Sequence, residues 1–196
     1  MKTFCQFSIL GLTLLVLALN TISTHVGAKV EPPNYNFSLD KFDLFFPGSK
    51  QSEIKKQYPN ETLVLSNGGF KTYKYYVEHI RYKFAILVQY QDGVVTDFHA
   101  RLPPYFLHDV FHQSLINRYG KQDIYKNEKE QSLYIWKNEK NFKHYYSGAC
   151  SVTCFPIYYS VRKVDRNNQG NYKTILEQLN ESENKTKQPQ QSGAGI

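Results

Sequence analysis

The sequence predicts an α+β protein built mainly from antiparallel strands. Tyr and Phe are abundant, with 16 and 13 copies in 196 residues, and these residue types favour half-buried pleated surfaces. From residue 62 onward, apolar and polar residues alternate in runs separated by turn signals such as Asp92-Gly93, and this period of two indicates strands joined by hairpins. In addition, one helical segment followed by several strands occurs twice along the chain.

The first occurrence is a short helix followed by a meander. Residues 38–46 are apolar and are expected to form one turn or an edge strand. A helix is predicted over 49–58, with Ser49 or Ser52 as its N-cap, and Pro59 ends it. Strands are then predicted at 62–66, 70–79, 80–91 and 94–102.

The second occurrence begins with an amphipathic helix over 105–119. Gly120 follows it, and glycine is typical of helix C-termini. Strands are predicted at 121–126, 131–137, 141–150 and 154–164. Beyond them, residues 166–196 are polar and are predicted to be a mostly disordered tail with a brief helix at 172–179.

Short motifs of the first half recur in the second half at a nearly constant spacing. Tyr73-Lys74-Tyr75 is matched by Tyr134-Ile135-Trp136 at an offset of 61 residues. Each sheet has an apolar face that needs a cover, which its helix or the other sheet supplies. We therefore expect one globular α+β domain, residues 29–165, made of two tandem units at about 46–102 and 105–164.

A helix that ends in Tyr58-Pro59 or Tyr119-Gly120, followed by a meander rich in Tyr and Trp, resembles the SmpA/OmlA (BamE-like) outer-membrane assembly lipoproteins. The tandem arrangement is similar to the secreted β-lactamase-inhibitor-protein fold, which contains two such units. The resemblance covers about residues 46–164. It implies a binding module that acts by protein contact through its sheet face, without catalysis. The chain departs from the lipoproteins because its N-terminal cysteine, Cys5, precedes the apolar segment.

The N-terminus has the layout of a secretory signal peptide. Lys2 precedes an apolar run at 7–19, and Val26-Gly27-Ala28 provides a cleavage site after Ala28. The alternative is a retained anchor, but a spanning helix needs about 20 apolar residues. We expect a protein that is secreted or periplasmic, with residues 1–28 removed.

The amount and distribution of charge argue against a nucleic-acid partner. The net charge is +7, and the basic residues are dispersed among acidic ones. Nucleic-acid binding would require a concentrated basic stripe, so we expect no nucleic-acid partner. Weak association with an anionic surface fits this charge.

Cys150 and Cys154 remain after cleavage and are expected to form a disulfide in an oxidising compartment. On a straight strand the two would lie about 13 Å apart, beyond disulfide reach. The bond therefore requires a turn at 151–153. A redox pair and two unpaired thiols are the alternatives.

His108 and His112 are four residues apart on one helical face, a spacing that suits zinc ligands. Asp109 between them echoes the glutamate of H-E-x-x-H, one methylene shorter. A third ligand would have to come from His99, His144 or Asp97. A pair of surface histidines is the simpler interpretation, so we expect no metal site and no cofactor. A metal-dependent hydrolase that uses His108 and His112 remains an alternative.

Aromatic and basic residues on the strands form the predicted binding face. Aromatic side chains and arginine are enriched at protein interfaces, although strand alternation directs part of the rings into the core. The predicted contact residues are Tyr73, Tyr75, Tyr82, Tyr90, Arg101, Tyr134 and Trp136. The sequence thus predicts an exported, non-enzymatic binding protein for a protein or glycan partner. A structural accessory protein of a cell-envelope assembly is the other alternative.

Overall fold

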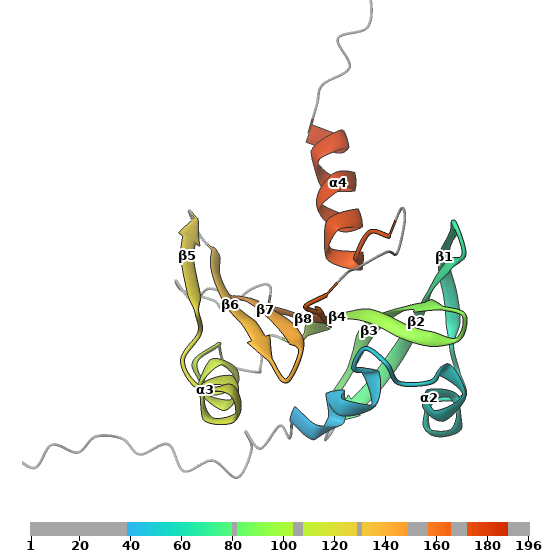
Figure 1. The fold of residues 1–196 in the computed structure, drawn as a ribbon, viewed down its shortest axis with the longest axis horizontal. Helices are drawn as coiled ribbons and strands as arrows, with labels where there is room; N and C mark the ends of the chain where they lie inside the picture. Colours follow the sequence, from blue (N-terminus) through green and yellow to red (C-terminus); the bar gives the residue numbers. More distant parts are fainter. Residues whose placement is uncertain are drawn as a thin grey trace, which may run out of the picture. The chain divides into compact units, whose positions relative to one another are not determined.

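The computed structural model describes residues 39–79, 82–103, 108–128, 131–148, 157–165 and 172–187. In this part of the chain, three helices cover one face of a single antiparallel sheet and a fourth lies on the other face (Figure 1). The helices are the 3-10 helix η1 (Leu39–Phe45), α2 (Gln51–Gln57), α3 (His108–Tyr119) and α4 (Ile175–Lys187). The strands are β1 (Thr62–Asn67), β2 (Phe70–His79), β3 (Tyr82–Gln91), β4 (Val94–Leu102), β5 (Ile124–Glu128), β6 (Gln131–Glu139), β7 (Phe142–Gly148) and β8 (Ile157–Lys163). The predicted α+β class is confirmed.

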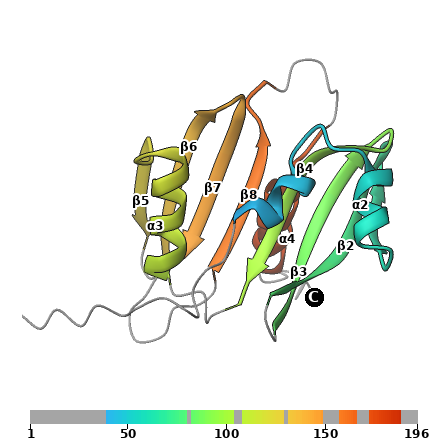
Figure 2. The same ribbon diagram turned by 90° about the horizontal axis from the view of Figure 1, so that it is seen from below.

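The eight strands lie in the order β1-β2-β3-β4-β8-β7-β6-β5. Strands that are neighbours in the sequence pair with each other within each half. The two halves join where β4 pairs antiparallel with β8, from Asp97 opposite Arg162 to Leu102 opposite Ile157. Figure 2 shows β4 and β8 side by side in the middle of the sheet.

Tight turns with left-handed backbone close three of the hairpins, and Gly68-Gly69 between β1 and β2 is the first of them. Asp92 and Gly93 have φ of 50° and 74° between β3 and β4, which confirms the predicted turn there. Lys140 and Asn141 have φ of 52° and 70° between β6 and β7, although neither is glycine. This backbone matches the twist of the flanking strands, so it fixes the register of each hairpin.

The core lies on the face of the sheet that η1, α2 and α3 cover (Figures 1 and 2). Ile54 of α2 and Leu115 of α3 are both fully buried against it. Phe42 of η1 fills the region over β4 and β8, stacking on Phe98 at 5.7 Å and meeting Tyr159 edge-on at 5.3 Å between ring centroids. The segment predicted as a turn or edge strand is therefore a 3-10 helix that packs over the centre of the sheet.

Two predictions about helix ends need correction. The N-cap of α2 is Lys50, not Ser49 or Ser52, and no side chain caps it. Lys50 is extended and bridges to Val94, and the Gln51 amide donates to the Gly93 carbonyl at 2.9 Å. Backbone pairing with the β3–β4 hairpin thus replaces a side-chain cap.

The C-terminal helix α4 continues to Lys187, well past its predicted end near residue 179. Thr174 and Glu177 form a capping box, in which the Thr174 amide donates to Glu177 Oε2 at 2.9 Å and the Glu177 amide donates to Thr174 Oγ1 at 3.2 Å. Part of the segment predicted to be disordered is therefore helical. Residues 166–171 and 188–196 lie outside the described part of the chain.

The described helices include none that is both long and apolar enough to span a membrane. The predicted signal peptide, residues 1–28, and the predicted disulfide between Cys150 and Cys154 lie outside the described residues.

Candidate binding face

Four of the predicted contact residues lie in the core beneath the helices. Tyr75, Tyr90 and Trp136 are at most 2 % exposed, and Tyr134 is 8 % exposed. Tyr73 is half-buried and packs against the same core. These rings are therefore part of the packing and do not form a contact surface. The side chain of Tyr82 lies outside the described part of the chain.

Hydrogen bonds inside the core explain why tyrosine and tryptophan are tolerated there. Tyr90 donates to Tyr75 Oη at 2.8 Å, and Tyr75 donates to Glu61 Oε2 at 2.7 Å. The indole N–H of Trp136 donates to the Gly120 carbonyl at 2.8 Å. Because each polar group has a partner, burying these rings leaves no unsatisfied donor.

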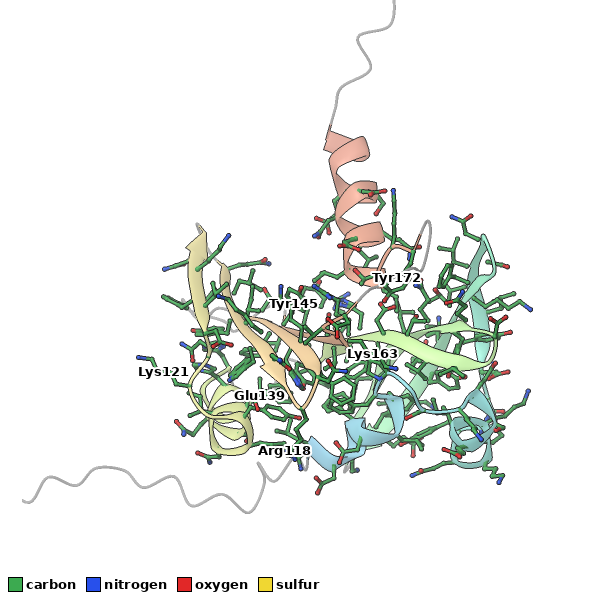
Figure 3. All side chains as sticks on the ribbon, viewed as in Figure 1. Arg118, Lys121, Glu139, Tyr145, Lys163 and Tyr172 are labelled. Carbon is green, nitrogen blue, oxygen red and sulfur yellow. The ribbon has the colours of Figure 1, made fainter. Side chains whose placement is uncertain are left out.

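Arg101 is different, because it is exposed on the opposite face of the sheet. We call this face, which η1, α2 and α3 do not cover, the open face. Strand alternation gives it Asp97, His99 and Arg101 from β4, and Tyr158 and Arg162 from β8. Figure 3 shows Tyr145 of β7 on the same side of the sheet as α4, and Arg118 of α3 on the other side.

A groove of about 1320 Å³ lies on the open face, with α4 as one wall. Its floor comes from β3, β4, β8, β7, β6 and β5, and Leu176 and Leu179 line its helical wall. The floor combines apolar, aromatic and cationic side chains: Leu87, Arg101, Lys126, Leu133, Tyr145 and Tyr158. A floor of this kind presents contact area together with positive charge.

The cations of the groove fall into two groups. Arg162 is fixed, because its Nε donates to Tyr145 Oη at 3.2 Å and its Nη1 donates to the Lys163 carbonyl at 2.8 Å. Arg101 and Lys126 are exposed and have no hydrogen-bond or ion-pair partner among the described residues. Their charges are therefore available to a bound group.

The acidic side chains of the groove belong to α4 or are bonded to it. Glu177 and Glu183 project from the helix. Asp97 is 2 % exposed, accepting from the Tyr172 hydroxyl at 2.7 Å and from the Ile175 amide at 2.8 Å. Burial raises the pKa of Asp97 to about 6, although these hydrogen bonds oppose the shift. The strand floor is therefore basic, whereas the helical wall is acidic.

Asp97 and Gln89 hold the N-terminus of α4 on the sheet. Gln89 is 1 % exposed, and it donates to the Lys173 carbonyl at 2.9 Å and accepts from Gln178 at 2.7 Å. Figure 1 shows α4 on the side of the sheet opposite α2 and α3. The wall of the groove thus depends on two polar side chains from β3 and β4.

His99 and Ser160 lie opposite each other at the centre of the open face. His99 Nδ1 is 2.7 Å from Ser160 Oγ, and both side chains are buried. Burial lowers the pKa of His99 to about 4, which makes the imidazole a weak general base at neutral pH. The carboxylate oxygens of nearby Asp97 bond Thr96, Tyr172 and Ile175. The pair therefore fits a structural cross-strand contact better than a nucleophile with its base.

The histidines of the alternative metal site lie in the aromatic core. The rings of His108 and His112 stack at 5.6 Å, and His108 bonds Tyr146 through Nδ1 at 2.9 Å and Tyr134 through Nε2 at 3.3 Å. His99 and Asp97 lie on the opposite face, so they are not available as a third ligand. The described residues contain no group of three or more His, Cys, Asp or Glu side chains placed to hold a metal ion.

The feature that the sequence did not reveal is the α4 wall, because it depends on contacts between residues far apart in the chain. The open-face residues Lys126 and Leu133 were missed for a related reason, since alternation alone does not say which face the helices cover. No family model, no curated protein and no solved structure matches this chain.

Proposed function

We propose that the protein is an exported, non-enzymatic binding protein that holds an acidic segment of a protein partner in the groove of its open face. The observation that carries the proposal is the combination, in one groove, of two cations, Arg101 and Lys126, that have no partner among the described residues, with the half-buried rings of Tyr145 and Tyr158. The predicted signal peptide, with cleavage after Ala28, supports export.

The size of the groove favours a segment of a macromolecule over a small ligand. Pockets for small molecules measure roughly 300–1,000 Å³ and enclose most of the ligand, whereas this groove measures about 1320 Å³. Its floor also spans several strands. An extended or helical segment of a protein fills such a space with side chains that contact Leu87 and Leu133.

The charge of the groove favours carboxylates on the partner. An arginine guanidinium pairs with a carboxylate through two parallel hydrogen bonds. Arg101 is exposed and has no partner in the described part of the chain, and Lys126 provides a second positive charge. A neutral glycan would stack on the tyrosines but would leave both charges unused. We therefore choose an acidic protein segment over a glycan.

We also propose that the fold consists of two tandem units related by a pseudo-twofold axis. The strand register supports this, because Asp97 pairs with Arg162 and Arg101 pairs with Tyr158. At the offset of 61 residues, Tyr158 corresponds to Asp97 and Arg162 corresponds to Arg101. His99 and its own equivalent, Ser160, lie directly opposite each other.

The pairings inside each half agree with this symmetry. Tyr75 pairs with Ile86, and its equivalent Trp136 pairs with His144. Ile86 then pairs with Ala100, as His144 pairs with Val161, the equivalent of Ala100. Duplication would place the open-face groove across the junction of the two units, where a binding surface requires both.

The test compares two charge reversals on opposite faces of the sheet. Arg101→Glu reverses a charge in the groove, and Lys56→Glu makes the same kind of change on α2. The parent and both variants are immobilised after a folding check by circular dichroism and used to capture partners from the native medium or envelope extract. We expect one partner to bind the parent and Lys56→Glu but not Arg101→Glu.

Measurements of peptide binding to the purified protein then test whether the groove recognises acidic segments. Peptides that cover the acidic segments of the captured partner are measured by fluorescence anisotropy at low and high salt. We expect affinity to fall with salt, because the contact depends on charge, and to fall further with Tyr145→Ser. Equal capture by Arg101→Glu and the parent would contradict the proposed surface.

A further inference from the structure

The outer edge of the sheet carries a second surface, formed by β1. All six residues of β1 are exposed, and Leu63, Val64 and Leu65 are 52, 52 and 45 % exposed. β1 pairs with β2 on one side, and no described strand pairs with its other side. It therefore presents open backbone hydrogen-bonding groups together with three consecutive apolar side chains.

Exposed edge strands normally carry features that prevent pairing, such as charged residues, proline or bulges. β1 has one of them, a bulge in which Leu63 pairs with Tyr73 and Leu65 with Thr72, so that Val64 has no partner in β2. Its sequence, TLVLSN, contains no charge and no proline. The opposite edge, β5, contains Lys126 and Glu128.

We propose that β1 pairs antiparallel with β1 of a second copy of this chain, which extends the sheet across a twofold axis. Antiparallel self-pairing places the middle of β1 near the middle of its copy, so any charge there would meet itself. The absence of charge in β1 removes this repulsion. Pairing of β1 with β5 of another copy would instead be head-to-tail, and such an interface forms a ring or an open filament, not a closed dimer.

The short length of β1 limits the expected affinity of the dimer. Six residues form a short strand pair, whereas stable complexes bury about 1,200–2,000 Å² in total. The exposed Leu63, Val64 and Leu65 add apolar contacts on both sides of the new strand pair. We therefore expect a reversible dimer that dissociates on dilution.

The experiment measures the mass of the processed chain by sedimentation velocity from micromolar to sub-millimolar concentration. The parent is expected to shift from one to two chains. Val64→Lys and Val64→Glu are each expected to stay monomeric, because each places like charges at the new strand pair. An equimolar mixture of the two variants is expected to recover the dimer, which a general loss of stability would not allow. Tyr125→Lys, at the exposed edge strand β5, is the matched control and should dimerise as the parent does.

A parent that remains monomeric at the highest concentration overturns the proposal. So does a dimer that persists in both Val64 variants or that Tyr125→Lys abolishes. Arg101→Glu leaves β1 unchanged, so loss of partner capture in that variant with retention of the dimer would separate this surface from the open-face groove.

Discussion

The two faces of the sheet are both rich in aromatic residues, but they differ in how their polar atoms are satisfied. On the helix-covered face, Tyr75 and Trp136 are fully buried and their polar groups are bonded inside the protein. On the open face, the half-buried Tyr158 lies opposite Arg101, an exposed cation with no hydrogen-bond or ion-pair partner among the described residues. Aromatic content alone therefore does not identify a contact surface. An exposed cation without a partner beside a ring is the more informative feature.

The largest expected effect comes from truncating a ring on the helix-covered face. Trp136→Ala removes a ring that is 1 % exposed and the hydrogen bond to Gly120. We expect the free energy of unfolding to fall by about 3–5 kcal/mol. Tyr145→Ala on the open face removes a half-buried ring under Lys143 and Arg162, and we expect a loss of about 1 kcal/mol. Urea denaturation measures both, and equal losses would show that the two faces are equally packed.

Strand positions could be predicted because alternation and turn residues act locally. The predicted strands at 70–79 and 94–102 match β2 and β4. The face of each strand that becomes buried could not be predicted in this way, because it depends on where η1, α2 and α3 pack. Tyr75 and Tyr76 are neighbours with similar side chains, yet Tyr75 is fully buried and Tyr76 is 43 % exposed.

Local sequence patterns do not predict the helical wall of the groove, because contacts between distant parts of the chain hold it in place. The Thr174 and Glu177 capping box is visible in the sequence, but the amide of Ile175 also bonds Asp97, which lies 78 residues earlier. Gln89 reaches the same helix from β3. Because such contacts form only after the sheet is assembled, sequence patterns underestimated the length and the role of α4.

Each face of the sheet buries a histidine, and both histidines are expected to make stability depend on pH. Burial lowers the pKa of His144 on the helix-covered face and of His99 on the open face to about 4 in each case. An unfolded histidine titrates near 6.5, so the unfolded chain binds more protons between these values. Stability is therefore lost as the pH falls from about 6.5 to 4, by at most about 3 kcal/mol per histidine.

Asp97 has the opposite effect. Its pKa of about 6 lies above that of an unfolded aspartate, so its contribution is lost as the pH rises through 6. The destabilising effect of the two histidines exceeds the stabilising effect of the one carboxyl group, so we expect the free energy of unfolding to decrease at acidic pH. Thermal unfolding between pH 4 and 7 measures it, and His144→Gln should roughly halve the net histidine effect. An unchanged slope in His144→Gln would show that His144 takes up its proton without unfolding.

The most local expected effect concerns α4 alone. Asp97→Asn keeps the size of the side chain but turns an acceptor of two strong hydrogen bonds, from Tyr172 and Ile175, into a group that also presents N–H donors. We expect the attachment of α4 to weaken by about 1–2 kcal/mol. Hydrogen exchange in α4 should then accelerate roughly tenfold while exchange in β6 stays the same.

Asp123→Asn is the matched control for this change. Asp123 accepts from the Lys137 amide at 2.6 Å in the other half of the sheet, far along the chain from α4. It should leave exchange in α4 unaltered. If Asp97→Asn accelerates exchange in β4 and β8 as strongly as in α4, then Asp97 stabilises the junction of the two halves. The groove would in that case owe its helical wall to Gln89 and to the burial of Ile175, which is 4 % exposed.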